Sequence, residues 1–263
     1  MRYLCLLIFL FSFFSSCSQQ DSNAANPPKI NQYSYRLGEK SILISKYTYE
    51  PVSDFFIIKL HDNEETGEEA AKIFLQEHGG VLLKIENNTE RFIEFRKHNR
   101  LYKFDPNRIF TKEGIVATLK IFNSYSPSVA NEVDGFAKYL LQLIPDTSVL
   151  IAVHNNTDKN YSIDDYLPGG ELKVDAKAAF KSNYQDIDDF IFTTDGLWYQ
   201  HFIAEEINAV LQHNLLSRND GSLSVYYGRR SRSYINIEAE YGHVEEQVNM
   251  LKTLLKVFEN NGK

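Results

Sequence analysis

Three side chains of metal-binding type stand in two short polar segments, each at the end of an apolar run. His61 and Glu64 follow the run at residues 55–58, and His154 follows the run at residues 149–152. Two imidazoles and a carboxylate are the protein ligands of catalytic zinc sites in which a fourth position stays open for water. If the three side chains converge, they predict a zinc hydrolase.

The spacing of these residues is a weak signal when each is taken singly. A lone His-x-x-Glu is common, and most such histidines are surface or capping residues. Here both histidines stand at the exit of a predicted strand, and each is followed by Asn and Thr. In an open α/β sheet, ligands bind at the carboxyl ends of the strands. The joint occurrence therefore favours one shared site.

The N-terminus has the order of an export signal. Arg2 precedes an apolar stretch, residues 4–14, that is too short to span a bilayer, and small residues then lead to Cys17. Bacterial lipoprotein signals have this order, with cleavage leaving Cys17 as the lipid-carrying residue; an ordinary secretory signal with a chance cysteine is the alternative. We expect a lipid-anchored protein of the cell envelope, facing the periplasm or the surface.

Composition limits the rest of the chain. Residues 18–30 are polar and read as a flexible tether, and residues 31–263 are expected to form one domain. Cys5 lies in the segment that would be removed, so any metal must sit on His, Asp and Glu. The net charge of −7, without a basic run, argues against nucleic acid as a partner.

Short apolar runs alternate with segments of helical period, which predicts an α/β fold: a mixed, mostly parallel twisted sheet with helices on both faces. The strands are expected at residues 41–47, 55–60, 81–86, 91–96, 149–154, 189–193, 222–227 and 234–239, with residues 101–104 as the hairpin partner of 91–96. Helices are expected at residues 66–77, 128–143, 197–212 and 244–258. The long connection around residues 168–170 is expected to border the cleft.

Four motifs resemble those of the M14-type zinc carboxypeptidases, most closely the succinylglutamate desuccinylase/aspartoacylase branch. Residues 61–64 (His-Asp-Asn-Glu) are similar to the family's His-Gly-Asn-Glu, and residues 104–110 are similar to Asp-Leu-Asn-Arg-x-Phe. Residues 153–157 resemble Leu-His-Asn-Thr-Thr, and residues 234–238 resemble a late strand that ends in Ile-Glu. The motifs keep the family's order and have comparable gaps, so together they are specific.

The resemblance covers residues 55–240 and has three departures. Asp62 replaces a glycine, Pro106 replaces a leucine, and Ala152 stands where the branch often has an aspartate. None of them removes a metal ligand. The resemblance implies a fold like that of the zinc carboxypeptidases.

The resemblance also implies the ligand set and its support. His61, Glu64 and His154 would bind Zn2+, and Asp105 would hold the free ring nitrogen of a ligand histidine, in the first place His61. Asn107 and Arg108 would bind a substrate carboxylate, for which a guanidinium fork is well shaped. The plainer alternative for Arg108 is a structural salt bridge with Asp105.

Further roles concern the reacting groups. Arg100 would polarise the scissile carbonyl and stabilise the oxyanion, unless it is a solvated turn residue. Glu238 would be the general base, with Glu240 as its competitor on the same face of the strand. Tyr226 or Tyr227, on the strand before Glu238, would cap the substrate.

Together these features predict an exported zinc-dependent metallohydrolase that cleaves an amide bond next to a free carboxylate. Export favours a carboxypeptidase-like enzyme acting on peptides, including cell-wall peptides. The alternative within the class is an N-acyl amino acid deacylase of the succinylglutamate desuccinylase/aspartoacylase type. The alternative of another class is a non-catalytic surface binding module on the same fold.

Overall fold

The structure is a computed structural model that describes residues 26–146, 149–158 and 160–261. The predicted signal segment, including Cys17, lies outside the described residues. Of the predicted tether, Lys29 and Ile30 belong to the first strand. Within the described ranges, no helix combines the length and the apolar character that a membrane span requires.

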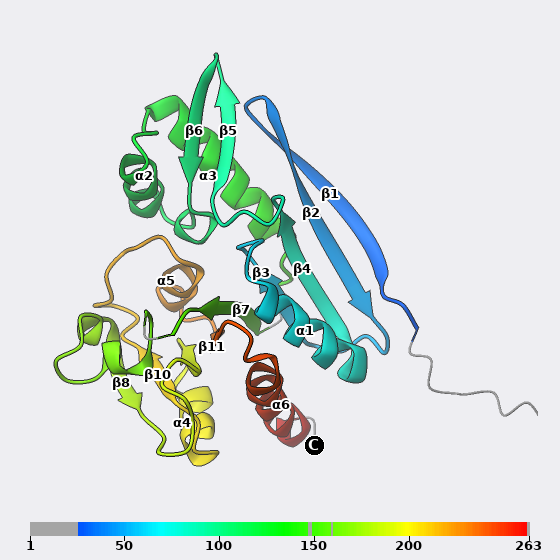
Figure 1. The fold of residues 1–263 in the computed structure, drawn as a ribbon, viewed down its shortest axis with the longest axis vertical. Helices are drawn as coiled ribbons and strands as arrows, with labels where there is room; N and C mark the ends of the chain where they lie inside the picture. Colours follow the sequence, from blue (N-terminus) through cyan, green and yellow to red (C-terminus); the bar gives the residue numbers. More distant parts are fainter. Residues whose placement is uncertain (1–25, 147–148, 159, 262–263) are drawn as a thin grey trace, which may run out of the picture.

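The described residues form a nine-stranded mixed sheet in the order β1-β2-β4-β3-β7-β11-β9-β10-β8, together with a separate hairpin (Figure 1). The strands of the sheet are β1 (Lys29–Leu37), β2 (Lys40–Tyr49), β3 (Phe56–Lys59), β4 (Gly80–Glu86), β7 (Leu150–Asn156), β8 (Ala176–Phe180), β9 (Phe190–Thr193), β10 (Ala209–Gln212) and β11 (Tyr234–Glu240). The hairpin pairs β5 (Ile93–Lys97) with β6 (Arg100–Phe104). At the centre of the sheet, β4, β3, β7 and β11 are neighbours and run parallel.

Helices cover both faces of the sheet, as predicted. They are α1 (Glu65–His78), α2 (Lys112–Ile121), α3 (Pro127–Gln142), α4 (Gly196–Ala204), α5 (Leu223–Gly228) and α6 (Val244–Asn261). One core lies between the sheet and α1, α4 and α6, and a second lies between the sheet, the hairpin and α2, α3 and α5. Figure 1 shows α1 and α6 side by side, with α2 and α3 next to the hairpin.

Strand β3 shows why its apolar run is continuous. Phe56 and Ile58 pack into the core of α2, α3 and α5, while Ile57 packs into the core of α1, α4 and α6. Side chains alternate between the faces of a strand, so a strand covered on both sides needs apolar residues at every position.

Two predicted elements are wrong. Residues 222–227 form the helix α5 instead of a strand, and the Ser222 hydroxyl accepts a hydrogen bond from the Val225 amide at its start. The helix predicted at residues 197–212 ends at Ala204, and β10 follows. In segments this short, apolar periodicity does not separate helix from strand. The strands β1 and β8 and the helix α2 are elements that the sequence analysis did not predict.

Helix α6 also joins the two strands nearest the predicted site. The Gln247 side chain is fully buried, and its amide donates to the carbonyl of His154 at 2.9 Å and to the carbonyl of Ile237 at 3.2 Å. These carbonyls belong to β7 and β11. Because buried carbonyls need partners, Gln247 fixes both strands at this level.

We expect Gln247→Leu to lower the free energy of unfolding by about 1–3 kcal/mol, since two buried carbonyls lose their donor. Urea unfolding followed by the fluorescence of Trp198 measures the change. Asn249→Leu, at an exposed position of the same helix, is the matched control. Equal stability of the two variants would contradict the linking role of Gln247.

Candidate metal centre

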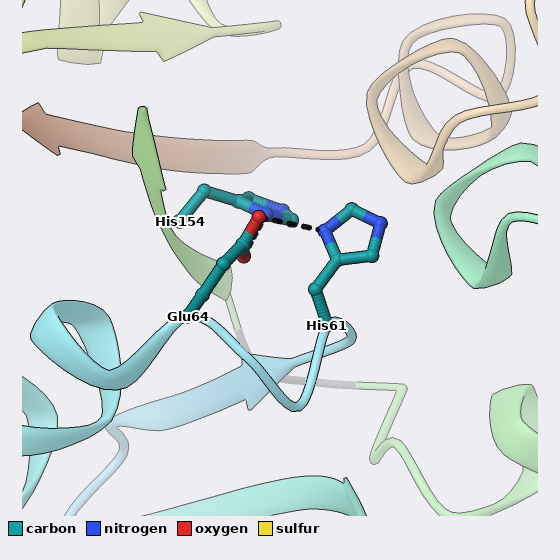
Figure 2. A group of neighbouring side chains, drawn as sticks. All are labelled: His61, Glu64 and His154. Atoms are coloured by element: carbon teal, nitrogen blue, oxygen red, sulfur yellow. Dashed lines mark hydrogen bonds and ion pairs between the residues drawn. The ribbon is translucent and has the colours of Figure 1, made fainter. Parts of the chain in front are cut away.

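His61, Glu64 and His154 lie together at the carboxyl ends of β3 and β7 (Figure 2). All three are buried, and one ligand atom from each lies within 4.8 Å of the others. The strands that carry them are parallel neighbours, with Ile58 opposite Ala152. The convergence follows from this pairing, because parallel neighbours end at the same edge of the sheet.

The two imidazoles present the same nitrogen to one carboxylate. Nδ1 of His61 lies 2.8 Å from Oε1 of Glu64, and Nδ1 of His154 lies 2.7 Å from Oε2. The other nitrogen of His61, Nε2, lies 2.8 Å from Oδ1 of Asp105. The contact expected between Asp105 and His61 is therefore present. Two nitrogens and a carboxylate that face one point form a candidate site for a divalent cation.

The pKa values of His61 and Glu64 reflect these contacts. Burial lowers the pKa of His61, but Glu64 and Asp105 outweigh it and raise the pKa to about 9. Burial raises the pKa of Glu64, yet His154 and His61 hold it well below its ordinary range. At neutral pH the His61 imidazole is thus protonated on both ring nitrogens, and a cation that binds must displace one of these protons.

Asp105 connects the centre to the predicted carboxylate-binding residues. Its backbone amide donates to the Thr118 hydroxyl at 2.9 Å, and its Oδ1 also accepts from the Asn107 amide at 2.8 Å. This bond caps a short 3-10 turn, Pro106–Arg108. Both Asn107 and Arg108 consequently line the same cleft as the three candidate ligands.

The guanidinium of Arg108 lies beside the carboxylate of Asp220, whereas the structural alternative considered from the sequence is a salt bridge with Asp105. Its Nη1 donates to the Asn107 carbonyl at 2.9 Å and lies 3.6 Å from Oδ2 of Asp220. Asp105 instead bonds His61 and the Asn107 amide. The structure therefore leaves the fork of Arg108 at the cleft wall, where it is available to an anionic group.

Glu238 lies next to the centre on β11, with its Cα paired to that of His154. The side chain is buried and lines the cleft. Burial raises its pKa, and burial together with the nearby charge of Glu64 outweighs the opposing effect of His154. Asn236, two residues earlier on the same face, donates to its Oε1 at 2.9 Å. A buried carboxylate with a raised pKa suits general acid–base chemistry.

The competing residue Glu240 belongs to a different cluster. One of its oxygens lies within 4.8 Å of carboxylate oxygens of Asp158 and Asp188. It is not among the described residues that line the cleft. The geometry thus favours Glu238 over Glu240 as the candidate base.

Arg100 does not lie at the centre, so its predicted position at the scissile carbonyl is wrong. It begins β6, donates to the Asn123 carbonyl at 3.2 Å, and lies over the Tyr102 ring at 5.4 Å. Arg91 is the arginine whose Nη1 lies 2.6 Å from Oε1 of Glu64. The sequence pattern did not single it out, because residues 91–96 are predicted as a strand, whereas β5 begins at Ile93.

A signal for Arg91 exists in the sequence. The polar residues 87–90 directly follow β4, which is the parallel neighbour of β3. A polar turn at the carboxyl end of such a strand lies at the same edge of the sheet as His61. This signal can be used only when the order of the strands in the sheet is known, because the sequence does not show that β4 lies beside β3.

The predicted substrate caps Tyr226 and Tyr227 also lie outside the cleft lining. They are on helix α5, where Tyr227 packs in the core and Tyr226 stacks under Arg230 at 3.6 Å. Tyr161 and Tyr166 line the cleft in their place, with their hydroxyls hydrogen-bonded to each other. Burial raises the pKa of both, so they remain neutral donors.

The cleft has a volume of about 730 Å³, and most of the residues that line it are polar. As expected, the connection around residues 168–170 borders it, through Tyr166 and Leu172. Six buried polar atoms that belong to its lining residues have no hydrogen-bond partner among the described residues: Asn107 Oδ1, His154 Nε2, Asn155 Oδ1, Asn156 Oδ1, Ser217 Oγ and Asn236 Oδ1. Buried polar groups are normally paired, so this wall fits a polar ligand.

No family model and no curated protein matches the chain by sequence. Among solved structures, the chain is similar to an aspartoacylase family protein from Mesorhizobium loti, with 13% identity and a TM-score of 0.45 over 86% of this chain and 65% of that one. It is also similar to a protein from Shewanella amazonensis assigned to the succinylglutamate desuccinylase/aspartoacylase family, with 10% identity and a TM-score of 0.41 over 88% and 73% of the two chains.

A third structure, from Shewanella denitrificans and assigned as a carboxypeptidase A, matches with 10% identity and a TM-score of 0.41 over 83% of this chain and 57% of that one. The neighbours thus carry the names of the family that the sequence motifs resemble. The chain spans about two thirds of the length of the Mesorhizobium loti protein.

Binding of a divalent cation should release about one proton from His61 at pH 7, because a coordinating imidazole must be neutral. With a pKa of about 9, His61 is protonated at neutral pH, and the release should vanish above that pH. Calorimetric titration with Zn2+ in buffers of different ionisation enthalpy measures it. Binding at pH 7 without proton release would contradict a protonated His61 in the metal-free protein.

Proposed function

We propose that this protein is a zinc-dependent hydrolase that cleaves an amide bond next to a free carboxylate. The observation that carries the proposal is the pair of buried Nδ1 atoms, from His61 and His154, facing the carboxylate of Glu64. This set of two nitrogens and a carboxylate fits zinc without any thiolate ligand. When bound, such an ion acts as a Lewis acid and makes water a better nucleophile at neutral pH.

The protein's own groups supply the remaining steps. Glu238 accepts a proton from the attacking water and returns it to the leaving amine, which its raised pKa supports. The guanidinium of Arg91 stabilises the negative charge that develops on the carbonyl oxygen. Asn107 and Arg108 hold the substrate carboxylate and so orient the scissile bond.

We infer a peptide as the substrate, with cell-wall peptides included. The polar residues that line the cleft support this, since polar side chains can form hydrogen bonds with the amides of an extended ligand. The export signal and lipid anchor proposed at Cys17 would place the enzyme in the cell envelope with such peptides. The deacylase alternative is supported by the motifs at residues 61–64 and 104–110, which most resemble the succinylglutamate desuccinylase/aspartoacylase branch.

Glu238→Gln should retain zinc and lose turnover by about 10²–10⁴-fold, because the base is removed while the candidate ligands stay. Zinc content by atomic absorption and hydrolysis of short peptides and N-acyl amino acids measure the two effects. Glu240→Gln is the matched control and should keep most activity. Stoichiometric zinc without hydrolysis of any amide by the unaltered protein would instead support a binding module.

Arg91→Ala should lower kcat by about 10²–10³-fold with a smaller change in KM, because the arginine acts on charge that develops in the transition state. Arg100→Ala removes the arginine outside the cleft and should leave both constants near those of the unaltered enzyme. If the two variants exchanged these phenotypes, the assignment of Arg91 would be wrong.

A further inference from the structure

Asp62 stands between the candidate ligands His61 and Glu64, yet its carboxylate bonds a neighbouring loop. Oδ2 accepts from the backbone amide of Asn87 at 2.7 Å and from that of Thr89 at 3.0 Å. The side chain is buried. One carboxylate oxygen therefore joins the metal loop, residues 61–64, to the loop at residues 87–91.

The other side of Asp62 is held by two lysines. Oδ1 lies 3.8 Å from Nζ of Lys59 and 3.6 Å from Nζ of Lys84. Lys59 is fully buried, and its Nζ also donates to the backbone carbonyl of Asp62 at 3.0 Å and pairs with Glu68. The main chain and the side chain of Asp62 are thus fixed together, as an anchor requires.

The loop that Asp62 holds needs such an anchor. Asn88 and Thr89 have φ of 55° and 59°, in the left-handed region that a β-branched residue such as Thr rarely adopts. Strained turns of this kind persist only where surrounding contacts determine them. Within the loop, the Asn87 side chain donates to the carbonyls of Glu90 at 3.1 Å and Phe92 at 2.9 Å.

Arg91 lies at the end of this loop. Its Nη1 is 2.6 Å from Oε1 of Glu64, although its side chain is 40% exposed. An exposed arginine has many rotamers, so the position of its guanidinium depends on the position of its own backbone. The backbone that leads to Arg91 is held by hydrogen bonds from two amides, those of Asn87 and Thr89, to Asp62.

We propose that Asp62 is a positioning residue that clamps the loop at residues 87–91 onto the metal loop and so fixes the Arg91 guanidinium beside Glu64. The inference deepens the proposed function and rests on it for the role of Arg91. It concerns a position where the family that this chain resembles has a glycine, which has no side chain to form such a clamp.

The test compares Asp62→Ala, Asp62→Asn, Arg91→Ala and the double variant Asp62→Ala/Arg91→Ala. If Asp62 acts through Arg91, Asp62→Ala lowers kcat by about tenfold or more, and the double variant is no slower than Arg91→Ala, since effects of coupled residues are not additive. Asp62→Asn keeps a carbonyl oxygen for the two amides and should retain most of the rate. Multiplicative losses in the double variant would overturn the proposal.

Hydrogen exchange supplies a readout that does not depend on turnover. In Asp62→Ala, the amides of Asn87 and Thr89 should exchange faster, while zinc content stays at the level of the unaltered protein. Unchanged exchange, or loss of zinc, would overturn the clamp even if no substrate is hydrolysed. Absence of hydrolysis with faster exchange would instead count against the proposed function alone.

Two further variants separate the clamp from a general loss of stability. Asn87→Ala removes the internal bonds of the same loop without touching the metal loop, and should reproduce the kinetic effect of Asp62→Ala should that variant fail to fold. Asp195→Ala is the matched control, because the Asp195 carboxylate also accepts a backbone amide, that of Leu197, at the start of α4. It should leave kcat unchanged; an equal loss there would overturn the proposal.

Discussion

Two buried imidazoles share the carboxylate of Glu64, and this contact constrains much of the surrounding structure. Removing three ionisable groups from water costs free energy unless each finds a partner. The partners come from distant parts of the chain, since Glu64 and His154 are 90 positions apart. Only the side-by-side parallel placement of β3 and β7 brings them together, so the sheet pairing and the site depend on each other.

The four parallel strands at the centre of the sheet bring the other candidate groups together in the same way. In the order β4-β3-β7-β11, each strand or the loop after it contributes one element of the cleft: Arg91, the pair of His61 and Glu64, His154, and Glu238. Parallel neighbours deliver their carboxyl ends to one edge, where a ligand can meet several loops at once. On the outer sides, β2 and β9 pair antiparallel with these four strands, and Phe192 of β9 and Gln212 of β10 also line the cleft.

The metal loop separates two different electrostatic environments. On the cleft side, wall atoms without partners and a raised pKa at Glu238 leave capacity for a ligand and for proton transfer. On the other side, Lys59 and Lys84 each pair with Glu68 and lie near the carboxylate of Asp62, so the buried charges there have partners of opposite sign. The pKa of Glu68 falls to about 2, because its hydrogen bonds to Lys59, Lys72 and Lys84 outweigh the opposing effect of burial. Paired charges therefore lie on one side of the metal loop, and the cleft with its polar lining residues lies on the other.

The sequence by itself indicated the α/β class and singled out His61, Glu64 and His154, because strand-length apolar runs and the polar residues at their ends are local patterns. Glu238 was singled out only by the resemblance of residues 234–238 to the family's strand that ends in Ile-Glu. The sequence did not place Arg91 or separate it from Arg100, and it predicted a strand where helix α5 forms. Short segments rich in Val and Tyr fit either conformation, and their context decides between them. Which arginine reaches the cleft depends on contacts between distant residues, such as that of Asp62 with the Asn87 amide, and a hydrogen bond of this kind leaves no periodic trace in the chain.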